Sequence, residues 1–454
     1  MLSLMQIIIT TISVIFTLSL VFFIKPFSAF AQGQSFSLKD ALKYGIERNP
    51  VFRNALVEEQ ISAEKTNEVS NRYLPRLSAT LDGRYNTQIA TQVLPAKAFN
   101  PNAGENELTE LRFGTNWNAS AALDLTQPIL DLSLGAEAAS AKASQNLASA
   151  NTEQAKQDLK MAIARAYYTV LLNEEKLRQA ESNLERTENF FNNIESKFAN
   201  ANALKTDRSR AYLNFSNAKL AKKKAQDAVR LSKMNLALQL SWEGKPDEIK
   251  LTEKLDALFA ADNAFQNRSL EAAWETRSDA KAELARREVN IKTLDRLRNQ
   301  NLPTLSGYGF LGTQGFGNEF GTINFFPLSY IGVRASIPLA DWFTRTSTIQ
   351  QQALQLDKTE NTLRNLRQTA LYQLEETQTA LQNAVQSVKI QKENIVIAEE
   401  VIATTTTRFK QGQATQQEVL DAENTLRDTQ VNYLQALYDA LVAKLDWERA
   451  NGML

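Results

Sequence analysis

The chain has 454 residues, and its 51 basic and 51 acidic side chains leave no net charge. It therefore has no overall field to attract nucleic acid or anionic lipid, and no nucleic-acid partner is expected. Cysteine and histidine are both absent. Their absence excludes disulfides, Cys or His zinc sites, nucleophilic pairs that need Cys or His, and lipid anchors on Cys. Any catalysis would have to use carboxylates, Lys, Ser or Tyr.

The first 31 residues have the pattern of a secretory signal peptide. Residues 7–24 are almost wholly apolar and are followed by Lys25 and Pro26, and residues 28–31 (Ser-Ala-Phe-Ala) place small side chains at −3 and −1 before Gln32. The segment before residue 7 has no Lys or Arg. An uncleaved anchor is the alternative, because about 18 apolar residues just span a bilayer. No later apolar run is long enough for a membrane helix, so a mature chain that enters a membrane must do so as a closed β-barrel.

The rest of the chain divides into two similar halves. Leu74–Leu77 recurs as Leu302–Leu305 at an offset of 228, and Pro128–Asp131 recurs as Pro338–Asp341 at an offset of 210. Lys197-Phe198 with Thr206-Asp207 recurs as Arg408-Phe409 with Gln417-Glu418 at an offset of 211. The offset falls because the first half has the longer segment between its prolines. This duplication predicts a first repeat at 32–240, a linker or equatorial segment at 241–268, and a second repeat at 269–454.

Between the prolines of each half, apolar and polar residues alternate with a period of two. The alternation covers Leu77–Asn86, Arg112–Leu125 and Tyr330–Ile337, whereas Leu305–Thr313 is Gly-rich and less clear. Such segments of about ten residues are typical of transmembrane strands, although a soluble sheet alternates in the same way. We predict β-hairpins at 77–127 and 305–337. The prolines mark the change from strand to helix, because Pro continues neither hydrogen-bond pattern.

Long helices are predicted outside the hairpins. Twelve positions from Leu159 to Phe198 follow a spacing of four and three residues, and ten of them are apolar, which is a sustained heptad pattern. No proline occurs from Leu134 to Phe198, so this helix would be about 95 Å long. The second half repeats the pattern from about Thr346 to Phe409. A solvated coiled-coil rod would explain these helices but not the hairpins.

Four strands cannot close a barrel, because small barrels need about eight. An open sheet in lipid would leave the backbone unpaired at both edges. Three copies would supply twelve strands and pair each edge with a neighbour, although strand counting also permits two or four copies. We therefore expect a mainly α fold with a membrane β-barrel: long coiled-coil helices form an α-barrel tunnel, and the four strands of each protomer contribute to a barrel that several copies close together.

Several motifs carry a family resemblance over nearly the whole mature chain. They are Phe36–Leu42 followed by Asn49-Pro50, both Leu-Pro-x-Leu turns, and Arg408–Thr415 leading into Glu418–Ala422. With these motifs the chain resembles the TolC-type outer membrane factor family, the outer membrane efflux proteins. Because no Cys follows the signal, it resembles the unlipidated branch.

This resemblance implies a homotrimer in the outer membrane with a periplasmic tunnel, so that the four β-strands per protomer contribute to a 12-stranded trimeric barrel. It implies as partners outer membrane lipid, a periplasmic adaptor and an inner-membrane transporter of RND, ABC or MFS type. The chain would be the passive exit duct of a tripartite efflux pump or a type I secretion system. No nucleotide-binding motif is present, so energy would come from the transporter. No cofactor, catalytic residue or metal site is expected, and drugs, metals, siderophores and protein toxins all remain open as cargo.

The resemblance further implies a gate at the periplasmic tip of the tunnel. Glu418 and Asp421 correspond to the family's acidic rings at the closed entrance. Thr206 and Asp207 correspond to constriction contacts in the first half, and Phe409 to an aromatic residue that helps to close the tip. An ordinary solvated helix turn is the alternative for this region.

The predicted turns between the long helices differ in the two halves. Gly412 suits a tight turn that needs a positive φ, and the first half offers Asn200 and Asn202, the next most tolerant residue type. The base that the family carries two residues after this glycine is Ala414 here. Arg408 or Lys410 could replace it.

Two other functions compete with the duct. A non-pore coiled-coil protein of the envelope would be extended and would not sediment with outer membranes. A secreted hydrolase that uses carboxylates would need a compact pocket, which long heptad helices do not readily form.

Overall fold

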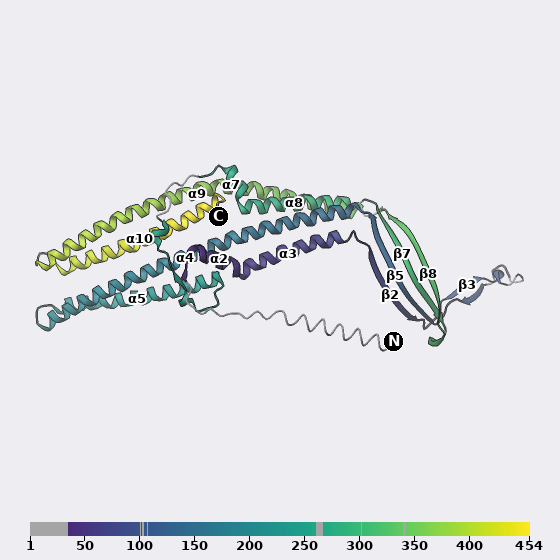
Figure 1. The fold of residues 1–454 in the computed structure, drawn as a ribbon, viewed down its shortest axis with the longest axis horizontal. Helices are drawn as coiled ribbons and strands as arrows, with labels where there is room; N and C mark the ends of the chain where they lie inside the picture. The colour runs from purple at the N-terminus through teal and green to yellow at the C-terminus, as the bar shows by residue number, and fades with distance from the viewer. Residues whose placement is uncertain are drawn as a thin grey trace.

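The computed structural model describes residues 35–99, 101, 104–106, 108–259, 267–300, 302–338 and 342–454. The predicted signal peptide lies outside these residues. Figure 1 shows an elongated molecule in which a helical rod carries a β-sheet at one end and two helical hairpins at the other.

The first half of the chain contains β1 (Ser35–Phe36), α2 (Leu38–Arg48), α3 (Pro50–Asn71), β2 (Arg76–Tyr85), β3 (Thr91–Pro95), η2 (Ala96–Ala98), β4 (Leu108–Arg112), β5 (Trp117–Leu130), α4 (Leu132–Ala199) and α5 (Lys205–Leu240). A connecting segment follows with η3 (Pro246–Glu248), β6 (Lys250–Leu251) and α6 (Leu255–Phe259). The second half contains α7 (Leu270–Thr276), α8 (Ser278–Asn299), β7 (Thr304–Gly317), η4 (Phe320–Thr322), β8 (Asn324–Ser336), α9 (Trp342–Lys410) and α10 (Gln416–Ala450).

The four long strands form one antiparallel sheet in the order β2-β5-β7-β8. The Gly-rich segment whose pattern was unclear is the strand β7. The strand predicted from the alternation at Arg112–Leu125 is wrong at its start, because Arg112 ends β4 and β5 begins at Trp117. The extra residues of the first half instead form a separate hairpin of β3 and β4, which projects past the end of the sheet (Figure 1).

The two longest helices agree with the heptad prediction. Helix α4 has 68 residues and α9 has 69, so each extends over about 100 Å at 1.5 Å per residue. All twelve predicted seam positions of α4 are buried or half-buried. Asp131 begins α4 by accepting hydrogen bonds from the amides of Ser133 and Leu134, at 2.9 and 3.2 Å, which satisfies two free N–H groups of the first turn.

The lateral order of the helices matches the order of the strands that continue into them. Near the sheet, α3 packs on α4, α4 on α8, and α8 on α9. Toward the far tip, α5 packs on α4, α4 on α10, and α10 on α9. One protomer is therefore a curved, single-layered wall whose edges are β2, α3 and α5 on one side and β8 and α9 on the other.

The largest hydrophobic core lies midway along the helices and joins both halves of the chain. The N-terminal strand β1 pairs in parallel with β6 there. The hydroxyl oxygen of the fully buried Tyr167 lies 3.0 Å from both the carbonyl oxygen of Phe36 and Glu253 Oε2, and these two acceptors share its one proton. This core fixes the start of the described chain against the long helices.

No helix within the described ranges combines the length and the apolar character that crossing a membrane requires. Nor do the described residues contain a group of three or more Asp and Glu side chains placed to hold a metal ion.

Candidate functional site

Two helical turns form the end of the molecule opposite the sheet (Figure 1). Residues 200–204 connect α4 to α5, and residues 411–415 connect α9 to α10. The amide of Asn202 donates to the carbonyl of Lys197 at 2.7 Å, and that of Gln413 donates to the carbonyl of Arg408 at 2.8 Å. Both turns therefore have the hydrogen bonding of a Schellman motif, which satisfies the last helix carbonyls.

The two turns place different residues in the left-handed conformation. Gly412 has φ +74°, as expected for a helix-ending glycine. In the first turn the left-handed residue is Ala201, with φ +59°. Asn200 and Asn202 lie in this turn, but neither has a positive φ, so the expectation that an Asn takes the glycine's role is wrong. The repeat offset of 211 pairs position 201 with 412 and could have revealed this.

The acidic residue after each turn begins the next helix. Glu418 Oε2 accepts from the amide of Thr415 at 3.1 Å, and Thr415 Oγ1 accepts from the amide of Glu418 at 3.2 Å. This is a complete capping box. Asp207 Oδ2 accepts from the amide of Leu204 at 3.3 Å, but the Leu204 side chain cannot accept in return. The predicted gate residues Glu418 and Asp207 thus occupy equivalent structural positions.

The other candidate gate residues lie close to these caps. Asp421 is exposed and accepts from Gln417 Nε2 at 2.8 Å, and Thr206 is exposed in the first turn of α5. No salt bridge within the described chain involves Glu418 or Asp421.

One contact joins the two hairpins at the tip. The Nζ of Lys197, near the end of α4, lies 5.9 Å from the centre of the Phe409 ring, near the end of α9. This distance suits a cation–π interaction. Phe409 therefore contacts the other hairpin of its own protomer.

Two arginines near the tip, Arg408 and Arg208, have partners within their own hairpins. Arg408 Nη2 donates to the carbonyl of Gln413 at 3.2 Å. Arg208 donates to Glu195 Oε2 at 2.5 Å and lies over the Phe198 ring. Its hydrogen bond to Glu195 and that residue's charge raise the pKa of Arg208.

A polar groove of about 430 Å³ lies above the tip, between α4, α5 and α10. Glu423 lines it, and burial raises the pKa of this carboxyl, although Arg186 partly opposes the shift. Gln179 also lines the groove, and its Oε1 has no hydrogen-bond partner among the described residues.

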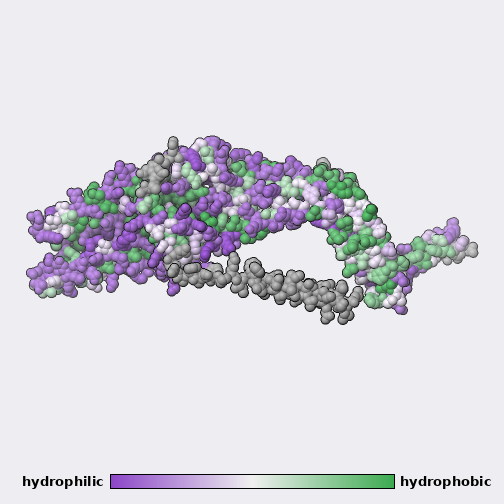
Figure 2. All heavy atoms as spheres, in the orientation of Figure 1, coloured by the Kyte–Doolittle hydropathy of each residue, from purple (hydrophilic) through white to green (hydrophobic). Residues whose placement is uncertain are grey.

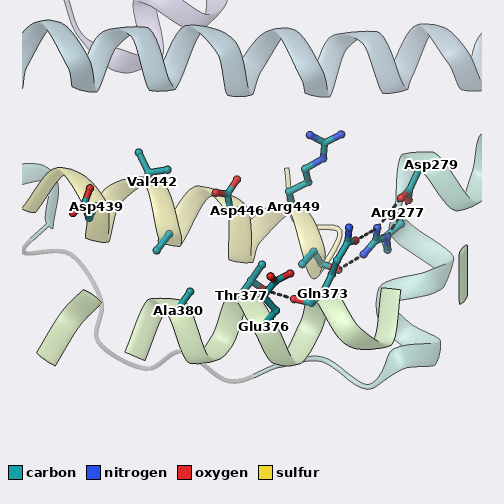
Figure 3. Close-up of a pocket in the computed structure, with 12 residues that line it drawn as sticks. Arg277, Asp279, Gln373, Glu376, Thr377, Ala380, Asp439, Val442, Asp446 and Arg449 are labelled. Carbon is teal, nitrogen blue, oxygen red and sulfur yellow. Dashed lines mark hydrogen bonds and ion pairs between the residues drawn. The ribbon is translucent and has the colours of Figure 1, made fainter. Parts of the chain in front are cut away.

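A second polar pocket, of about 650 Å³, lies where α7 and α8 meet α9 and α10 (Figure 3). Arg277 is buried and points toward Asp279 and Gln373, donating to Asp279 Oδ2 at 2.6 Å and to Gln373 Oε1 at 2.7 Å. Burial alone would raise the pKa of Asp279, but the hydrogen bond and charge of Arg277 hold it below its usual range. Arg277 Nη1 also donates to the carbonyl of Ala450 at 3.4 Å, so this buried residue links the C-terminal helix α10 to α8 and α9. The sequence pattern did not single it out.

The two faces of the sheet differ in charge. Because the strands are in register, odd-numbered residues of all four strands share one face and even-numbered residues share the other. All charged residues of these strands are even-numbered: Arg76, Asp82, Arg84, Asp124 and Arg334. The odd-numbered face is dominated by Leu, Ile, Val, Ala and Gly, and Figure 2 shows hydrophobic residues concentrated over the sheet while the helical tips are mainly hydrophilic. We call the odd-numbered face the apolar face and the even-numbered one the charged face.

Aromatic side chains gather at the end of the apolar face that lies far from the helices. Trp117 lies with its ring centre 4.9 Å from that of Tyr85 and 5.1 Å from that of Phe320. Such a cluster at the end of an apolar band is typical of the aromatic belt at a membrane–water interface.

Comparison with known proteins gives one family match over part of the chain. Residues 266–452 match the model of the outer membrane efflux protein family. No curated protein sequence matches the chain.

Solved structures share the fold over most of the chain. A membrane protein from Pseudomonas aeruginosa superposes with a TM-score of 0.74 at 16% identity, covering 94% of this chain and 98% of that one. The outer membrane protein VceC from Vibrio cholerae gives 0.69 at 16% identity, with 91% and 96% covered. The open-state MtrE outer membrane channel from Neisseria gonorrhoeae gives 0.72 at 17% identity, with 91% and 88% covered.

Proposed function

We propose that this protein is an outer-membrane exit duct for efflux. Two findings support the proposal: residues 266–452 match the outer membrane efflux protein family, and most of the chain shares its fold with solved membrane proteins. Three copies form the duct. Its sheet lies in the outer membrane and its helices enclose a tunnel in the periplasm.

The observation that carries this proposal is the open four-stranded sheet with one uncharged face. In lipid, each unpaired backbone N–H or C=O costs several kcal/mol. The outer edges of β2 and β8 have no partner strand within the described chain, so another copy must pair with them. Pairing β8 of one copy with β2 of the next turns the apolar face toward lipid and encloses the charged face around water.

The edge helices of neighbouring copies meet in the same arrangement as their edge strands. Because their lateral order follows that of the strands, the rotation that joins β8 to a neighbouring β2 also brings α9 to the neighbour's α3 and α5. These edge helices leave large apolar side chains exposed in one copy: Val51, Leu56, Val57 and Ile61 on α3; Leu213, Leu220, Leu231 and Leu238 on α5; and Leu371, Ile390, Val396, Ile397 and Val401 on α9. A soluble protein rarely leaves such stripes uncovered, and association of the copies would bury them.

The tip supplies the gate in this proposal. Three copies of Glu418 and Asp421 form acidic rings at the tunnel entrance, since both are exposed and lack a salt bridge within the described chain. Asp207 and Thr206 lie at the equivalent turn of the other hairpin, and the Lys197–Phe409 contact holds the two hairpins together. Rings of like charge attract cations and resist further approach of the carboxylates.

The partners follow from the passive character of the duct. A periplasmic adaptor docks on the helical hairpins, and an inner-membrane transporter of the RND, ABC or MFS type delivers the cargo. The same duct would serve a type I secretion system.

A gate test must separate charge from helix capping. Glu418→Gln retains a side chain that can complete the capping box, and Asp421→Asn removes the second charge with little change in shape. We expect the double variant to conduct more in planar bilayers and to be blocked less by divalent cations. The matched control is Asp428→Asn, an exposed carboxylate farther along α10. Unchanged conductance and block in the double variant would refute the gate assignment.

The duct itself is tested by fractionation and ion current. The full-length protein should sediment with outer membranes and give ion-conducting channels after purification in detergent. A protein released by carbonate without detergent would contradict the proposal.

A further inference from the structure

Aromatic side chains form a cluster on the charged face of the sheet, where a water-filled lumen would ordinarily need only polar groups. Tyr308 and Phe310 of β7 and Tyr330 and Arg334 of β8 are all even-numbered and therefore share this face with Arg76, Asp82 and Asp124. They are separate from the aromatic belt around Trp117, which lies on the opposite face.

The rings form an ordered platform. Phe310 and Tyr330 are direct cross-strand partners, and their rings stack with centres 4.9 Å apart and planes 4° from parallel. Tyr308 meets Tyr330 edge to face at 6.1 Å. The Arg334 guanidinium carbon lies 4.9 Å from the centre of the Tyr308 ring.

A glycine lets one ring lie along the wall. Gly332 is directly opposite Tyr308, and a Cβ at this position would lie only 2.6 Å from the Tyr308 hydroxyl oxygen and 2.7 Å from its Cζ. The Tyr308 ring thus occupies the space of the missing side chain. Tyr330, which is 48% exposed, remains open to a ligand.

The charge beside the platform indicates the sign of the ligand. Arg334 forms no salt bridge within the described chain, and its cation–π contact with Tyr308 leaves the guanidinium N–H groups available to an anion. Guanidinium binds a carboxylate through two parallel hydrogen bonds. The carboxylate of Asp124, on the same face and directly opposite Phe310 on β5, lies at the other side of the platform, so a ligand carboxylate is directed to the Arg334 end.

We propose that this platform binds planar aromatic carboxylates in the lumen, with the ring on Tyr330 and Phe310 and the carboxylate on Arg334. The inference rests on the proposed function, because the charged face encloses a lumen only in the assembled barrel. Three copies place three such sites around the barrel, which makes its wall selective toward aromatic anions.

The experiment uses the full-length protein in lipid nanodiscs, with empty nanodiscs subtracted, and naphthalene-2-carboxylate as the probe in saturation-transfer NMR. We expect saturable binding that is stronger than that of cyclohexanecarboxylate, which lacks the planar ring, and of 2-naphthalenemethanol, which lacks the charge. Phe310→Leu with Tyr330→Leu retains apolar bulk and should weaken binding about tenfold. Arg334→Gln leaves both rings and should remove the preference for the carboxylate over the alcohol. Phe320→Leu, in the belt on the apolar face, is the matched control and should bind as the unaltered protein does.

Equal binding by the unaltered protein, the Leu variant and the Gln variant would overturn the inference, as would equal affinity for the naphthalene and cyclohexane acids. The Gln variant decides the outcome alone if the Leu variant does not assemble. Ion current through the same preparation separates the two proposals: current without probe binding refutes the platform and leaves the duct intact, whereas a protein that gives no current refutes both.

Discussion

A single lysine placed on either face of β8 should have opposite consequences for membrane insertion. Ile331 lies near the middle of β8, is 92% exposed, and belongs to the apolar face. Leu328 is 42% exposed, lies three residues away and belongs to the charged face. The two side chains are similar in size, so Ile331→Lys and Leu328→Lys differ mainly in the medium that the new charge enters.

The expected difference is large because it is repeated in every copy. A lysine on the lipid face at the bilayer midplane costs about 2–4 kcal/mol per chain, which is about 6–12 kcal/mol for three chains. A lysine on the lumen side remains in water and should cost less than about 1 kcal/mol. The Ile331→Lys protein should therefore be lost from the outer membrane fraction or degraded, while the Leu328→Lys protein should be present at nearly the normal level.

The assay is immunoblotting of separated outer membranes together with urea unfolding of the protein in detergent-free liposomes. Equal sensitivity to the two substitutions would refute the assignment of the faces. A greater loss with Leu328→Lys would show that the charged face contacts lipid.

Substitutions at three further places test the helical part. Ala201→Gly should slow hydrogen exchange of the amides at 200–204 and stabilise the turn by up to about 1 kcal/mol, because a positive φ is unfavourable for Ala. Gly412→Ala should destabilise its turn for the same reason. No change in either turn would contradict this reasoning. Arg277→Met leaves Asp279 and Gln373 without their partner and should lower the free energy of unfolding by about 3 kcal/mol. Arg277→Lys should cause a smaller loss. An unchanged melting curve would show that the contacts of Arg277 do not stabilise the fold. Burial raises the folded-state pKa of Glu423, so its contribution to stability is present at low pH and is lost as pH rises through the folded pKa. Glu423→Gln should therefore raise the melting temperature at neutral pH but not in acid, whereas the exposed Glu400→Gln should change neither; a shift that is the same at both pH values would argue against buried charge as the cause.

The long helices and most of the sheet could be predicted from the sequence because their patterns are periodic. The heptad seam of α4 and the alternation of β2 both follow from repeated burial on one side of an element. The Pro-bounded change from strand to helix was also visible. β7 is harder to recognise, because five of its fourteen residues are glycines, which interrupt the apolar alternation. At Gly315 the missing side chain leaves room for the Phe325 ring.

Other features depend on contacts that a linear pattern does not contain. Ala201 takes the left-handed conformation although its side chain disfavours it, because the Schellman hydrogen bonds of the turn fix the backbone there. The sequence analysis assigns Glu418 only to the gate and does not predict its capping role. Thr415, three residues earlier, is the ordinary sign of a capping box. The pairing of Arg277 with Gln373 joins residues 96 positions apart, and the boundaries of the two repeats remain predictions.

Cross-linking between copies tests most directly whether each chain supplies only part of a closed wall. The chain has no cysteine, so Thr80→Cys on β2, combined in turn with cysteine at positions 328, 330 and 332 of β8, provides the only thiols for a short bismaleimide. We expect at least one pair, in membranes, to give covalent dimers and trimers, with nothing larger than three chains. A product that never exceeds one chain for any pair, or a series that ends at two or continues to four, would contradict the threefold barrel.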